Sequence, residues 1–82
     1  MSGGFFDYQQ YTINDIKEKI EDYLNDNEYG YSEQTLKEFM IAISLLRKSY
    51  IYSQRIDYLL SDDDGEYSFH ERLKEDLSKL YE

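Results

Sequence analysis

The acidic segment "LLSDDDGEYSFHERL" (residues 59–73) carries carboxylates at a spacing that suggests calcium chemistry. The EF-hand loop follows the pattern D-x-[DN]-x-[DN]-G-x₅-E, in which side-chain oxygens bind the ion. With the glycine in sixth place, Asp62, Asp64 and Glu71 occupy the third, fifth and twelfth places. Leu60 then stands first, where the pattern requires a carboxylate ligand. We therefore predict an acidic turn that precedes a helix, and we assign no metal ligands.

Other catalytic chemistry has little support. His70 is the single histidine, and "HERLK" lacks the second histidine of the H-E-x-x-H zinc motif. No glycine-rich phosphate loop or G-x-S-x-G nucleophile motif occurs. The chain has 18 Asp and Glu side chains, so some pair of carboxylates at a spacing suited to acid–base catalysis is easily found. Such a pair is therefore no evidence of catalysis. We expect a protein that is not an enzyme and needs no cofactor.

The charge balance is strongly acidic, with 18 Asp and Glu against nine Lys and Arg and a net charge of −9 over 82 residues. Such a surface repels nucleic acid and attracts basic partners. The chain has no cysteine, its start lacks a signal-peptide pattern, and no apolar run approaches the ~20 residues of a membrane helix. We expect one domain (1–82) in a reducing cytoplasm, with no direct binding to nucleic acid or membrane.

Basic residues gather once, in "RKSYIYSQR" (47–55), where they alternate with tyrosines. Aromatic rings between cations can stack on a base while the cations neutralise its phosphate. A candidate anion or nucleotide site therefore consists of Arg47, Lys48, Tyr50, Tyr52 and Arg55. The alternative is a stripe of amphipathic side chains at the edge of a helix interface.

Apolar periodicity predicts an all-α fold, either a three-helix bundle or a helical hairpin. The predicted helices cover residues about 13–26, 33–60 and 69–81. Thr12, Ser32 and Ser68 are the predicted N-caps, and a tyrosine precedes each of them. Between helices, Asn27 and Gly30 tolerate the left-handed conformation that ends a helix.

The central helix is much longer than its neighbours, about 42 Å against about 20 Å at 1.5 Å per residue. It carries two apolar stripes. The first is Leu36, Phe39, Met40, Ile43, Leu46 and Tyr50, and the second is Ile41, Leu45, Tyr52, Ile56 and Leu59. Two flanking helices in a monomer would cover both stripes, and so would a homodimer along the second stripe. We favour self-association, because two short helices leave part of the long one uncovered. The aromatic leader (1–10) would fold back onto the core or swap into a second subunit.

Two segments, residues 1–8 and 52–77, resemble a family of small acidic bacteriophage and prophage proteins. That family opens with S-G-G-x-F-[DN]-Y and closes with a segment like I-D-W-L-x-S-G-D-D-G-E-x-S-F-x-x-R-L. This chain has Tyr58 where the family tends to have tryptophan, and Asp62 where it tends to have glycine. The family carries no settled activity. The resemblance implies a mobile-element origin.

Small acidic proteins of mobile elements are often inhibitors of host defences. The leading hypothesis is therefore a phage protein that inhibits a host antiviral system, such as a CRISPR effector or another nuclease, by imitating nucleic acid. Its basic partner would contact the carboxylates of Glu18, Glu21, Asp22, Asp62, Asp63, Asp64 and Glu66, with exposed tyrosines as anchors. One alternative is an oligomer that sequesters an anionic nucleotide signal. Another is a structural or regulatory helical phage protein.

Overall fold

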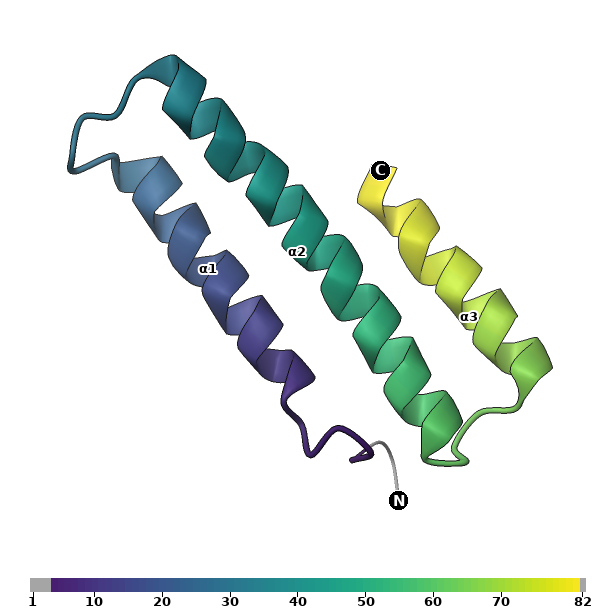
Figure 1. Cartoon of the computed structure of the whole chain (residues 1–82). Helices are drawn as coiled ribbons and strands as arrows, with labels where there is room; N and C mark the ends of the chain where they lie inside the picture. Colours follow the sequence, from purple (N-terminus) through teal and green to yellow (C-terminus); the bar gives the residue numbers. More distant parts are fainter. Residues whose placement is uncertain (1–3, 82) are drawn as a thin grey trace.

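Three α-helices make up the fold in the computed structural model, which describes residues 4–81 (Figure 1). They are α1 (Gln10–Asp26), α2 (Glu33–Leu60) and α3 (Glu66–Ser78), and a 3₁₀ turn, η1 (Lys79–Tyr81), follows α3. The prediction of an all-α chain built on a long central helix is confirmed, and the boundaries of α2 agree with the predicted ones.

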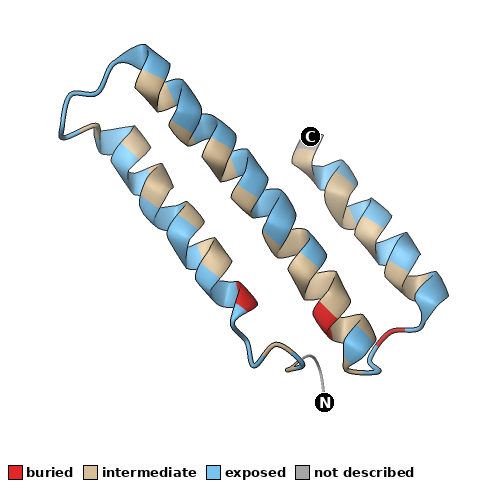
Figure 2. Ribbon diagram, viewed as in Figure 1, coloured by how far each residue is buried: buried red, intermediate tan, exposed pale blue. Residues whose placement is uncertain are grey.

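The helices lie side by side, with α2 between α1 and α3 (Figure 1). The Cα trace measures 47 × 26 × 13 Å, so the chain is a flat layer little more than one helix thick. Among the described residues no apolar side chain is buried, and the three buried residues are Gln10, Asp57 and Asp64 (Figure 2). Contacts between polar groups therefore fix this layer at its most enclosed points.

The predicted cap of the central helix is confirmed. Ser32 is the N-cap residue of α2, and its hydroxyl accepts the backbone N–H of Thr35 at 3.4 Å. A Ser or Thr oxygen at this place satisfies one of the backbone donors that the first helical turn leaves unpaired.

The predicted caps of the two flanking helices are wrong by three residues. α1 begins at Gln10 instead of about residue 13, because turns of the leader already lead into it and make a cap at Thr12 unnecessary. α3 begins at Glu66 instead of about residue 69, with Gly65 as its N-cap. Ser68 lies inside the first turn, where its hydroxyl accepts the N–H of Gly65 at 3.2 Å.

The turn between α1 and α2 is closed by Asn27 and by a row of aromatic rings. Asn27 has φ 46°, and its N–H donates to Tyr23 O at 2.7 Å, which ends α1 in the predicted left-handed conformation. Its side chain also accepts the N–H of Tyr31 at 2.9 Å. The rings of Tyr23, Tyr29, Tyr31 and Phe39 follow one another at centroid distances of 5.9, 5.7 and 5.8 Å. These packed rings explain several tyrosines without any ligand.

Candidate functional site

The side of α1 turned away from α2 carries a line of carboxylates. These are Asp15, Glu18, Asp22 and Asp26, spaced by three, four and four residues, and all are exposed. We call this line the acidic edge. Side chains at such spacings stand about 5–6 Å apart at Cβ along one helix face. Within residues 4–81, none of the four forms an ion pair with a described cation. The acidic edge therefore offers four carboxylates that no described cation pairs with, although Lys19 lies beside it.

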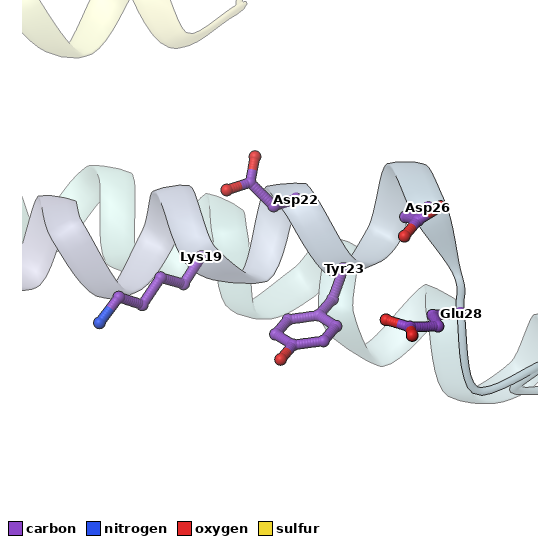
Figure 3. A pocket seen from close by; sticks show the side chains of 5 residues that line it. All are labelled: Lys19, Asp22, Tyr23, Asp26 and Glu28. Atoms are coloured by element: carbon purple, nitrogen blue, oxygen red, sulfur yellow. The ribbon is translucent and has the colours of Figure 1, made fainter.

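An exposed aromatic ring lies beside the end of the acidic edge. Figure 3 shows the Tyr23 ring between Lys19 and Glu28, with Asp22 and Asp26 on the same helix. These five residues line a pocket of about 520 Å³. Tyr23 and its stacked neighbour Tyr29 are 47% and 64% exposed, so both can pack against a partner. An aromatic anchor next to carboxylates suits a basic protein surface.

Only two of the three acidic residues predicted on the first helix belong to the acidic edge. Glu18 and Asp22 lie on it. Glu21 lies on the α2 side and accepts a hydrogen bond from Lys17 at 2.9 Å. The sequence interpretation missed Asp15 and Asp26, although the same helical spacing runs on to both.

The predicted acidic residues of the α2–α3 turn form a separate group. Asp62, Asp63 and Glu66 are exposed. This turn and the C-terminal part of α1 lie at opposite ends of the layer (Figure 1). The seven predicted carboxylates therefore do not form one surface.

The structure corrects the predicted role of Asp64 as a partner contact, because its carboxylate is buried within the chain. It is 8% exposed, and its Oδ1 accepts a hydrogen bond from Arg72 Nη1 at 2.9 Å. Its Oδ2 lies 3.7 Å from Arg55 Nη1 and receives no hydrogen bond. Two guanidinium groups thus hold this carboxylate, which the calcium pattern would have used as the ligand in its fifth place. Across the described part of the chain, no cluster of three or more His, Asp or Glu side chains is arranged to hold a metal ion.

The predicted nucleotide site does not assemble as a unit. Arg55 donates from Nε to Asp76 at 2.8 Å, approaches Asp64, and lies 5.2 Å from the centroid of the Tyr58 ring, so its guanidinium is occupied. Tyr50 packs against Tyr11 with ring centroids 6.0 Å apart. Burial raises the pKa of Tyr50 above its ordinary 10.0, with smaller contributions from Tyr11 and Tyr58. Lys48 and Tyr52 lie on another face of α2 from Tyr50.

Two of those residues instead line a pocket together with cations from other elements. Arg47 and Tyr50 share a pocket of about 280 Å³ with Lys17 of α1 and Lys79 of η1. Asn14, Ile51 and Asp76 complete its lining. No local sequence signal links these cations, because they come from three elements distant in sequence.

The leader closes onto a buried carboxylate at the end of α2. Asp57 is 1% exposed, and it accepts the N–H of Gly4 and that of Phe6, each at 3.0 Å. The Phe5 N–H donates to the Ser61 hydroxyl at 3.2 Å. The leader therefore folds back onto its own chain, which was one of the two predicted alternatives. Residues 4–6 and the end of α2 therefore meet at this point. The sequence interpretation missed Asp57, because its partners are backbone groups.

In the part of the chain that the structure describes, no helix combines the length and the apolar character needed to cross a lipid bilayer. Comparisons with protein-family models, with curated proteins and with solved structures found no match to this chain.

Proposed function

We propose that this chain is a non-enzymatic binding protein that inhibits a nucleic-acid-binding defence protein of a bacterial host, such as a CRISPR effector or another nuclease. The observation that carries the proposal is the acidic edge of α1, with its four exposed carboxylates in line and without described cation partners. A partner that binds a phosphate backbone has Lys and Arg where these carboxylates would sit.

The physical basis is electrostatic complementarity. A basic channel attracts a chain of net charge −9 at long range, and paired charges then fix its orientation. Tyr23 and Tyr29 supply apolar contact area beside the charges. Competition for the channel excludes the nucleic acid, so inhibition needs no catalytic group on this chain.

The origin and the compartment belong to the same proposal. The resemblance of residues 1–8 and 52–77 to small acidic phage and prophage proteins supports a mobile-element source. The site of action would then be the cytoplasm of the host cell, where defence nucleases meet invading nucleic acid.

The test is affinity capture from host lysate with the tagged protein, at low and at high salt. Asp22→Lys/Asp26→Lys replaces two of the four carboxylates with cations and so neutralises the acidic edge. Glu71→Lys/Glu75→Lys is the matched control, because it makes the same charge change on exposed i,i+4 positions of α3. We expect a nucleic-acid-binding protein to be captured by the wild type and the control, to be lost with the acidic-edge variant, and to dissociate as salt rises. Capture that survives both high salt and the acidic-edge variant would contradict the proposal.

A second candidate function has an observation of its own. Lys17, Arg47 and Lys79 gather at one pocket in a chain of strongly negative charge, and Tyr50 and Asp76 lie beside them. Lys17 also pairs with Glu21 at 2.9 Å, so Arg47 and Lys79 are the cations most available to a ligand. This arrangement favours a small phosphate-bearing ligand, as in a protein that sequesters a nucleotide signal.

A thermal-shift titration with adenine-containing mononucleotides and cyclic nucleotides tests this second function. A bound nucleotide raises the unfolding temperature of the wild type. Arg47→Ala should abolish that shift. Lys48→Ala should preserve it, because Lys48 is outside the pocket. No shift in the wild type, or equal shifts in both variants, would exclude the pocket as the binding site.

A further inference from the structure

A regular line of exposed residues runs along α2 on the face that carries the second apolar stripe. It consists of Gln34, Glu38, Ile41, Leu45, Lys48 and Tyr52, spaced by four, three, four, three and four residues. We call this line the α2 seam. Such spacing is the heptad pattern by which one helix packs along another. Ile41, Leu45 and Tyr52 are 52%, 60% and 39% exposed, so the seam has no partner within the described chain.

The stripe predicted from the sequence also included Ile56 and Leu59, but the structure leaves these two half-buried. The exposed part of this face therefore runs from Gln34, in the N-terminal half of α2, as far as Tyr52. α3 ends opposite the middle of α2, so much of that half has no neighbour on the α3 side (Figure 1).

The accessible surface of the chain is larger than that of a typical folded monomer of its mass. Its accessible surface is 6253 Å² at a mass of 9.9 kDa. A folded monomer of that mass exposes about 5,200 Å² by the usual scaling with mass. The excess of roughly 1,000 Å² is comparable to the ~800 Å² that each partner buries in a stable protein–protein interface. No described apolar side chain is buried, so the excess includes the apolar faces of the helices.

We propose that two copies of this chain form an antiparallel dimer through the α2 seam. The seam is symmetric about position 43, so a twofold axis there places Ile41 of one copy against Leu45 of the other, and the reverse. The next layer outward places Glu38 against Lys48. The outermost layer places Gln34 against Tyr52. Each contact occurs twice, as an isologous interface requires.

Charge decides the direction of the pairing. In a parallel, in-register pair each residue meets its own copy, so Glu38 would face Glu38 and Lys48 would face Lys48. In the antiparallel pair, Glu38 of each copy faces Lys48 of the other, so opposite charges meet in both of these layers. Neither side chain forms an ion pair with another described residue, so both charges are available. An apolar centre flanked by two ion pairs specifies both partner and register.

Sedimentation equilibrium of the full chain tests the dimer and its contact face. The wild type should sediment as a dimer at micromolar concentration, and Leu45→Glu should make it monomeric. Met40→Glu is the matched control, because Met40 is 55% exposed on a neighbouring face of α2. Circular dichroism verifies that each variant is helical. A monomeric wild type, or a dimer that tolerates Leu45→Glu, would overturn the proposal.

A charge-exchange cycle tests the antiparallel register without removing apolar contacts. Glu38→Lys and Lys48→Glu should each weaken the dimer by roughly tenfold, because each dimer contains the affected layer twice. The double variant restores both ion pairs with reversed sign and should regain most of the wild-type affinity. Single changes without effect, or a double variant weaker than either single one, would exclude this register.

Discussion

The carboxylate of Asp57 accepts the backbone N–H of Phe6 at 3.0 Å, although 51 residues separate the two in sequence. The same carboxylate accepts the N–H of Gly4, so one buried side chain satisfies two backbone donors of the leader. Buried carboxylates are costly unless such donors compensate them. The leader and the end of α2 therefore stabilise each other.

Asp57→Asn should destabilise the fold and release the leader. The amide oxygen can still accept one N–H, but the amide nitrogen then faces the second donor and cannot accept it. We expect a loss of about 1–3 kcal/mol in the free energy of unfolding, measured by urea denaturation. Hydrogen exchange at the Gly4 and Phe6 amides should accelerate. Asp22→Asn is the control at an exposed position, and equal stability of the two variants would contradict this prediction.

Arg55→Lys should weaken the attachment of α3 to α2. The guanidinium reaches Asp76 through Nε and Asp64 through Nη1, and a single ammonium cannot reproduce that fork. We expect a loss of about 1–2 kcal/mol in unfolding free energy. Arg47→Lys makes the same change at an exposed residue and should leave stability within about 0.5 kcal/mol of the wild type. If the two variants unfold at the same urea concentration, the ion pairs of Arg55 contribute nothing specific to stability.

Asp62→Gly should stabilise the turn between α2 and α3. Asp62 has φ 63°, a left-handed conformation that glycine adopts without steric cost. We expect a gain of about 0.5 kcal/mol. Asp62→Ala removes the same charge and retains the strain, so it should not stabilise. A gain of the same size in both variants would assign the effect to charge alone.

Stability should decrease at alkaline pH partly through Tyr50. Burial raises the pKa of Tyr50, so the folded state keeps its phenol proton when the unfolded chain has begun to lose it. Its contribution is therefore complete below pH 10, the ordinary pKa, and is lost as pH rises through the higher folded-state value. Tyr50→Phe should show a smaller decrease in unfolding free energy between pH 9 and 11 than the wild type. Tyr67→Phe, at an 80% exposed tyrosine, should behave as the wild type.

Much of the fold is readable from the spacing of apolar residues, and the exceptions have local causes. The stripes predicted three helices and the full extent of α2, because apolar periodicity does not depend on distant contacts. Two starts were wrong, because Thr12 and Ser68 have the sequence character of caps but other groups begin the helices. At α3 the hydroxyl of Ser68 binds the N–H of Gly65 from inside the first turn.

The candidate sites were harder to predict than the helices, because they depend on tertiary contacts that the sequence alone does not indicate. Glu18 and Asp22 are exposed on one face of α1, as helical spacing alone predicts, and their contact with a partner stays a prediction. Asp64 was misassigned, because in sequence it is one of three consecutive aspartates, and only the folded chain distinguishes the one that Arg72 holds.

The pairing of Asp57 with the leader also sets an order of events during protein synthesis. Ribosomes add about 5–20 residues per second, so Asp57 is made about 3–10 s after Phe6. Until then the amides of Gly4 and Phe6 lack their acceptor, and the neighbouring phenylalanine rings have no fixed place on the nascent chain. The leader is made before its acceptor, and it is therefore among the last segments of this chain to reach its final position.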